Sequence, residues 1–309
     1  MVTSLSLPPF NYLIINFFTF SFFFIFLFKK SKIIRARKIF FLYGWLFGFG
    51  YFITNLYWIS ISLTFDQDFK FLIPLAFFLI PAFLGIFYGL VTYFFIIFKQ
   101  KKIVISFLVF SLIFGILEFI RGSILTGFPW NLIAYSFSNQ LEISTITSII
   151  GTYGFNLFCI SLFTCPAIFI LRDTKKDIGV CIIFLITTIL FFIYGSYYEK
   201  KFNESDLNTY DYKIRVIGSN ISLDRFYSDK DPISVIKDLI KISEPNKKEK
   251  TIFVWPEGIL PNISQKELIE YNWLFKEHFS ENHLLIIGIN SQSVNEGINN
   301  YYNSLSIYD

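Results

Sequence analysis

The fold is decided by residues 103–120, I-V-I-S-F-L-V-F-S-L-I-F-G-I-L-E-F-I, an apolar run with a single charged side chain near its end. A helix that crosses a bilayer needs about 20 mostly apolar residues, because lipid offers the backbone no hydrogen-bond partners. Five other stretches meet this requirement: 10–28, 39–63, 71–98, 149–171 and 178–195. The sequence therefore predicts a polytopic α-helical membrane bundle with about six spans in residues 1–198.

The composition divides the chain into two parts. Of the 309 residues, 54% are apolar and 16% are charged, whereas soluble domains carry about 25% charged residues. Residues 1–198 hold 37 of the 42 phenylalanines and a net charge of +8, while residues 199–309 have a net charge of −4. The basic residues lie in short clusters between apolar runs, which argues against binding of nucleic acid.

The basic clusters predict the orientation of the bundle, because short connections rich in lysine and arginine stay on the cytoplasmic side. The clusters are Lys29, Lys30, Lys32, Arg35, Arg37 and Lys38, then Lys99, Lys101 and Lys102, then Arg172, Lys175 and Lys176. They follow the first, third and fifth predicted spans. We therefore expect the N-terminus, the loop around Trp130 and residues 199–309 on the opposite, outer side.

Two charged residues, Glu118 and Arg121, lie three positions apart at the outer end of the fourth predicted span. That spacing puts them on one helix face, where they can form a structural ion pair or reach the membrane interface. Charge inside a membrane is also a functional indicator. The sequence Gly127-Phe128-Pro129-Trp130 that follows predicts a turn with interfacial aromatic side chains.

Residues 199–309 alternate short apolar runs with amphipathic segments, which is typical of a sheet covered by helices. We expect a buried strand at 213–217 and further strands at 251–255, 284–289 and 302–308. One helix is expected to begin at Asp231 and Pro232, and another at the capping box of Ser264 and Glu267.

Few residues can carry chemistry. His278 and His283 are the only histidines, too few for a zinc site without carboxylate help, and they are expected to be solvated or structural. Cys159, Cys165 and Cys181 lie in apolar runs, which favours packing over disulfides or metal binding.

Glu257 is the candidate catalytic residue, in the segment Trp255-Pro256-Glu257-Gly258 that directly follows a predicted strand. A carboxylate at a sheet edge beside Trp and Pro is expected to be partly desolvated, which raises its pKa and suits a general base. The alternative is an ordinary carboxylate in a turn.

Several of these segments together resemble bacterial apolipoprotein N-acyltransferase, in the order of that family and over nearly the whole chain. They are Glu118-Phe119-Ile120-Arg121-Gly122, Leu125-Thr126-Gly127-Phe128-Pro129-Trp130-Asn131, Gly151-Thr152-Tyr153-Gly154, Val254-Trp255-Pro256-Glu257 and Tyr302-Asn303-Ser304. The second is quite specific, whereas Trp-Pro-Glu is shared by nitrilase-type amidases and acyltransferases.

The resemblance implies a multi-pass inner-membrane enzyme with a nitrilase-like αββα domain on the periplasmic side, of which residues 199–309 are the N-terminal part. Such an enzyme moves an acyl chain from a phospholipid, through a cysteine thioester, to the α-amino group of diacylglyceryl-cysteine in an apolipoprotein. A glutamate takes the thiol proton, and a lysine stabilises the oxyanion. Glu257 matches the glutamate. No metal or organic cofactor is implied.

The same resemblance places the family's lysine and cysteine beyond Asp309, and Cys159, Cys165 and Cys181 precede the soluble part and cannot replace the nucleophile. The family has eight spans, so the chain is expected to be truncated at both ends. The alternative function is therefore a catalytically inactive, truncated or split remnant of the enzyme. A transporter or binding protein is disfavoured, because the spans carry few midplane charges and no detectable repeat.

Overall fold

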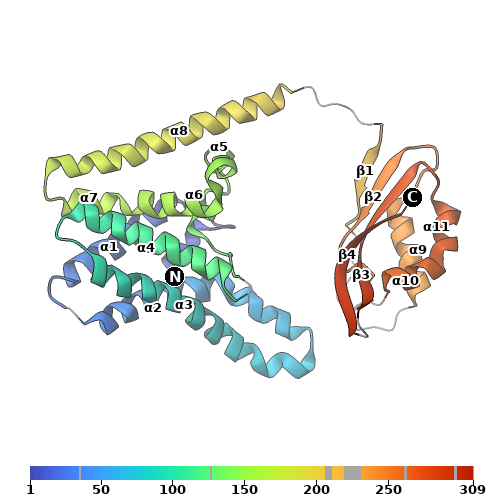
Figure 1. The fold of residues 1–309 in the computed structure, drawn as a ribbon, viewed down its shortest axis with the longest axis horizontal. Coiled ribbons are helices and arrows are strands. Elements are labelled where there is room, and N and C mark those ends of the chain that lie inside the picture. Colours follow the sequence, from blue (N-terminus) through green and yellow to red (C-terminus); the bar gives the residue numbers. More distant parts are fainter. Residues whose placement is uncertain are drawn as a thin grey trace. The chain divides into compact units, whose positions relative to one another are not determined.

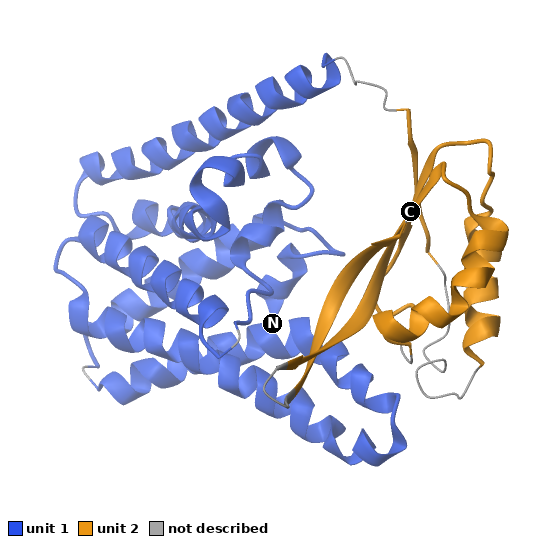
Figure 2. Cartoon of the chain, turned by 45° about the vertical axis from the view of Figure 1, so that its right-hand side comes forward, with its two compact units in different colours: residues 1–205 blue, residues 206–309 orange. Residues whose placement is uncertain are grey.

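The computed structural model describes residues 1–34, 36–125, 127–205, 211–218, 231–260, 263–295 and 298–308. The chain forms two compact units, Met1–Ser205 and Asp206–Asp309, which are coloured separately in Figure 2. Arg35 of the first basic cluster and Thr126 of the motif at 125–131 lie outside the described residues.

Unit 1 is a bundle of long apolar helices joined by short connections (Figure 1). The helices are α1 (Ile14–Lys30), α2 (Arg37–Leu56), α3 (Ile73–Phe98), α4 (Ile103–Ser123), α5 (Leu141–Ser144), α6 (Thr147–Thr164), α7 (Pro166–Leu171) and α8 (Ile178–Asn203). The 3-10 helices are η1 (Val2–Ser6), η2 (Tyr57–Thr64), η3 (Gln67–Leu72), η4 (Ile133–Phe137) and η5 (Lys175–Asp177).

Five helical segments in the described part of unit 1 are long and apolar enough to cross a membrane. They are Arg37–Thr64, Gln67–Phe98, Ile103–Ser123, Thr147–Leu171 and Lys175–Asn203. The predicted span at 10–28 falls on α1, whose 17 residues are at the lower limit for crossing a bilayer. A sixth span therefore stays a prediction.

Helices α2 and α3 pack closely because glycines face each other along their interface. An ideal Cβ placed on Gly44 would lie 2.1 Å from the carbonyl oxygen of Tyr88, and one on Gly48 would lie 2.7 Å from the Tyr88 Cβ. The Thr92 hydroxyl donates a hydrogen bond to the carbonyl oxygen of Phe40 across the same interface. Small residues give membrane helices such close contacts.

The three basic connections meet at one end of unit 1. The ammonium groups of Lys32 and Lys99 lie 5.2 and 5.7 Å from the centre of the Phe28 ring, which joins the first connection to the second. The backbone N–H of Ile103 donates to Asp173 Oδ2 at 3.1 Å, which joins the second to the third. The fold thus gathers the positive charge at a single end.

Unit 2 is a four-stranded sheet in the order β1-β2-β3-β4, with helices on one face (Figure 1). The strands are β1 (Lys213–Val216), β2 (Thr251–Trp255), β3 (His283–Asn295) and β4 (Ile298–Tyr308), and the helices are α9 (Pro232–Ser243), α10 (Gln265–Leu268), η7 (Ile269–Tyr271) and α11 (Asn272–His278). β1, β2 and β3 are parallel, and β4 is antiparallel to β3.

Both predicted helix starts in unit 2 are confirmed. Asp231 Oδ1 accepts a hydrogen bond from the backbone N–H of Ile233, and Pro232 begins α9. Ser264 and Glu267 form a reciprocal capping box at α10. The apolar side chains of these helices pack on Phe253, Trp255 and Ile287 of the sheet.

The expected burial of the strand at 213–217 is wrong in part. Ile217 is buried, but Ile214 and Val216 are 70% and 71% exposed. β1 is an edge strand, and successive side chains of a strand point to opposite faces. Ile214 and Val216 therefore lie on the face without helices, called here the open face, together with Leu305 and Ile307.

Candidate functional site

Trp255 fixes the end of β2, where the candidate carboxylate follows. Its ring is 1% exposed, and its Nε1–H donates to Ser243 Oγ of α9 at 2.9 Å. The strand ends at Trp255, and Gly258 has a φ of +68°, which turns the chain back. Glu257 thus occupies a tight turn whose start is held by the core.

Gly288 lets this turn lie against the neighbouring strand β3. An ideal Cβ on Gly288 would be 2.7 Å from the Cα of Glu257 and 2.9 Å from its backbone nitrogen. No larger residue fits without moving the backbone. Because of this close approach, Glu257 lies against β3 and within reach of β4.

Asn303 of β4 holds the Glu257 carboxylate. Its Nδ2–H donates to Glu257 Oε1 at 2.5 Å, and Oε2 makes no hydrogen bond to any residue that the structure describes. Asn303 is opposite Asn290 in the ladder, on the same face as Leu305. Asn303 lies in the motif Tyr302-Asn303-Ser304, but the sequence does not predict this contact, which depends on the register of β4.

The expected desolvation of Glu257 is wrong, because this side chain is exposed. It lies on the open face, whereas the buried side chains of β2 and β3 point toward the helices. The carboxylate is therefore positioned by hydrogen bonding and backbone geometry rather than by an apolar enclosure.

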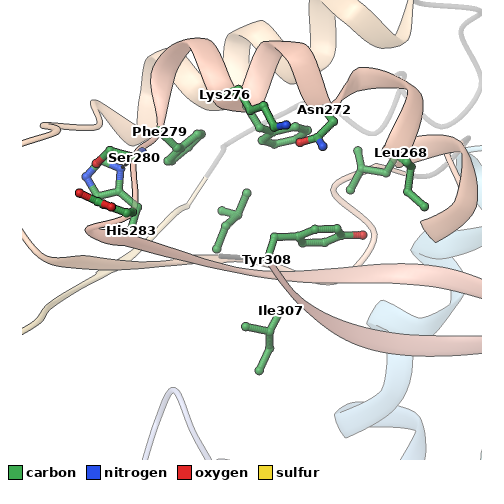
Figure 3. A pocket seen from close by; sticks show the side chains of 12 residues that line it. Leu268, Asn272, Lys276, Phe279, Ser280, His283, Ile307 and Tyr308 are labelled. Atoms are coloured by element: carbon green, nitrogen blue, oxygen red, sulfur yellow. Dashed lines mark hydrogen bonds between the residues drawn. The ribbon is translucent and has the colours of Figure 1, made fainter.

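A pocket of about 520 Å³ lies on the helix-covered side of unit 2 (Figure 3). The side chains of Leu268, Asn272, Lys276 and Phe279 descend toward Tyr308, and Ile307 is on the other side of the strand. Burial raises the pKa of the Tyr308 phenol. Glu257 is not among the residues that line this pocket, so the pocket and the candidate base are separate features.

His283 and the three cysteines occupy structural positions. His283 is buried at the start of β3, where its Nδ1 accepts from the Ser280 N–H and its Nε2 lies 2.9 Å from the Asn246 carbonyl oxygen. Cys159, Cys165 and Cys181 are buried and free, as expected for packing. Within the described residues no group of three or more His, Cys, Asp or Glu side chains could hold a metal ion.

Glu118 and Arg121 form a buried ion pair near the end of α4. Arg121 Nη2 and Nε lie 2.6 and 3.3 Å from the two carboxylate oxygens of Glu118. The residues are 1% and 2% exposed, so neither reaches the surface. The structural pairing considered from the sequence is confirmed.

The comparison with protein families decides the relationship. The family model of the apolipoprotein N-acyltransferase N-terminal domain matches residues 1–165. The chain belongs to this family. The match covers the helices of unit 1 up to the end of α6, including the Glu118–Arg121 pair and the loop around Trp130.

Curated relatives extend the similarity into unit 2. An apolipoprotein N-acyltransferase of Rhizobium leguminosarum bv. trifolii is 29% identical over 279 residues, which cover 86% of this chain and 51% of the relative. One of Rickettsia prowazekii is 32% identical, covering 80% and 48%. One of Allorhizobium ampelinum is 27% identical, covering 100% and 59%. The chain spans about half the length of these family members.

Proposed function

We propose that this chain acts in apolipoprotein N-acylation, in which an acyl chain passes from a phospholipid to the N-terminal α-amino group of diacylglyceryl-cysteine. Membership of the family supports the reaction class. One observation supports a specific catalytic residue: Asn303 holds the Glu257 carboxylate just after the end of β2.

Glu257 would act as the general base. A carboxylate with one oxygen fixed by Asn303 keeps the other free to accept a proton from a thiol. The thiolate then attacks the phospholipid ester carbonyl to form a thioester, the ester C–O bond breaks, and the lysophospholipid leaves as an alcohol with the proton that Glu257 returns. The amine of the acceptor attacks that thioester, an amide bond forms as the C–S bond breaks, and the proton lost by the amine passes through Glu257 to the departing thiolate. No residue of this chain is assigned as the thiol nucleophile, and none is assigned as the cation that stabilises the oxyanion.

The setting that we propose is the bacterial inner membrane, with unit 2 on the periplasmic side as part of a nitrilase-like αββα domain. We likewise propose that the membrane part comprises residues 1–198 and that the periplasmic part begins at residue 199. Five membrane-capable helices and the gathering of three basic connections at one end support it.

The test is acyl transfer to a diacylglyceryl peptide by the chain reconstituted in phospholipid vesicles. We expect Glu257→Gln to lower the rate by about 10²- to 10⁴-fold, the range for loss of a general base. Glu270→Gln, at another exposed glutamate of unit 2, is the control and should leave the rate unchanged. No transfer by the unmodified chain would favour the alternative, an inactive remnant, and equal rates for both variants would exclude Glu257 as the base.

A further inference from the structure

Four successive backbone carbonyls in the loop after α4 each accept a hydrogen bond from a side chain. Arg121 Nη1 donates to the carbonyl oxygens of Phe128 and Trp130, at 2.7 and 3.1 Å. The hydroxyl of Tyr135 donates to Pro129 at 3.3 Å, and that of Tyr51 donates to Asn131 at 2.9 Å. The donors come from α4, η4 and α2.

Arg121 is the centre of this arrangement. Its other nitrogens bind Glu118, and its guanidinium carbon lies 5.2 Å from the centre of the Phe52 ring. A planar guanidinium with five N–H donors can bind both oxygens of a carboxylate and two carbonyls at once, whereas a lysine has only three donors for these four acceptors. The pair is neutral overall, so the loop is fixed without burying an unpaired charge at this site.

The loop is held in a conformation that it would not adopt unaided. Leu125 and Asn131 have φ values of +53° and +56°, in the left-handed region that ordinary residues occupy rarely. Such backbone persists where the surrounding contacts over-determine it, and it is found at functional sites. The hydrogen bonds from Arg121 and Tyr51 to the loop carbonyls are the contacts that hold this backbone conformation.

The fixed loop presents an aromatic ledge, made of Trp58, Phe128 and Trp130. The Trp130 ring stacks on Trp58 at 4.9 Å and 20°, and on Phe128 at 5.8 Å and 28°. Trp58 and Trp130 are 40% and 49% exposed. Their indole N–H groups make no hydrogen bond to the residues that the structure describes, whereas those of Trp45 and Trp255 donate within the protein.

We propose that this ledge binds a phospholipid at the boundary between its acyl chains and its headgroup, and that Arg121 is the residue that positions it. Trp58 lies in η2, in the last turns of the membrane-capable segment Arg37–Thr64, and Phe128 and Trp130 follow the end of α4; indoles concentrate near the ends of such segments. The rings offer apolar area to the acyl chains, and the free N–H groups suit phosphate or ester carbonyl oxygens. This inference is independent of any role of Glu257.

Fluorescence quenching by phospholipids tests the proposal, on the full chain reconstituted in vesicles. The lipids carry bromine either near the headgroup end or near the methyl end of the acyl chain. The contributions of Trp58 and Trp130 are the differences between the unmodified chain and the variants Trp58→Phe and Trp130→Phe. We expect both contributions to be quenched roughly two-fold more strongly by the shallow bromine than by the deep one.

Arg121→Lys should abolish this depth preference, because the three donors of lysine cannot replace the four hydrogen bonds that Arg121 makes to Glu118 and the two loop carbonyls. Arg172→Lys, at an exposed arginine of the opposite end of unit 1, is the control and should keep the preference. If Arg121→Lys does not fold, Tyr51→Phe removes only the bond to Asn131 and should weaken the preference. Absence of quenching of Trp58 and Trp130 would overturn lipid binding, and an unchanged preference in Arg121→Lys and Tyr51→Phe would overturn the positioning role.

Discussion

Asn303 determines where the candidate base points, because its side-chain amide is the only hydrogen-bond donor that the described residues give to the Glu257 carboxylate. We expect Asn303→Leu to lower acyl transfer by about 10- to 100-fold, the effect of a misdirected catalytic group. The rate in vesicles measures it. Asn299→Ala, on the same strand and also exposed, should leave the rate unchanged. A normal rate in Asn303→Leu would show that this contact has no part in catalysis.

The Glu118–Arg121 pair gives a prediction on stability. Glu118→Gln leaves the Arg121 charge buried without its partner, so we expect the free energy of unfolding to fall by about 3–5 kcal/mol. The control is Glu204→Gln, since Glu204 forms a solvent-exposed pair with Lys200, and exposed pairs contribute about 0–1 kcal/mol. Thermal unfolding in detergent compares the variants, and an equal effect of both would contradict the expected weight of the buried pair.

Residues that act through local sequence could be predicted, and those that act through tertiary contacts could not. The position of Glu257 followed from its place after a strand, and the Glu118–Arg121 pair followed from helical spacing. The contact of Asn303 depends on the register of β4 and on the missing side chain of Gly288. The exposure of Glu257 depends on which face of the sheet the helices cover, and no short stretch of sequence contains that information.

At the scale of elements, the contact between α2 and α3 rests on glycine. We expect Gly44→Ala to lower the free energy of unfolding by about 1–3 kcal/mol, as overpacking does, because its Cβ would meet the backbone of Tyr88. Gly179→Ala, in α8, meets nothing within 4 Å and is the matched control. Thermal unfolding of the two variants in detergent gives the comparison. Equal midpoints would mean that the interface adapts to a methyl group.

The capping box of α10 predicts a dependence on pH. Hydrogen bonds from Ser264 lower the pKa of Glu267 below its ordinary value of 4.5. The ionised cap therefore stabilises unit 2 fully above that value, and this stabilisation is lost as the pH falls through the lowered pKa. Glu267→Gln should remove this part of the acid sensitivity, and Glu270→Gln should not. Urea unfolding of the full chain at neutral and acid pH, followed by a signal from unit 2, measures the difference. An unchanged pH profile in Glu267→Gln would contradict it.

At the scale of the whole molecule, the sequence did not determine which strand faces of unit 2 are buried and which form the open face. A strand buried on both faces and an edge strand with one open apolar face have the same composition, so 213–217 could not be told apart from a core strand. Long apolar runs are less ambiguous, because only a membrane-capable helix explains 18 or more such residues. Five of the six predicted spans are accordingly confirmed as membrane-capable helices, whereas in unit 2 the strands were predicted and the burial of 213–217 was not.

The distribution of charge in unit 1 predicts its orientation in the membrane. The three basic connections lie together at one end, and η2 and η3 lie at the other end of the α2–α3 hairpin. Since all three native cysteines are buried, single cysteines introduced at exposed sites report accessibility with little background. In intact cells, a membrane-impermeant maleimide should label Gln67→Cys and should label Lys101→Cys only after the membrane is opened. Replacing the three basic clusters with neutral residues should weaken this asymmetry. Labelling of Lys101→Cys in sealed cells would mean that the orientation is the reverse.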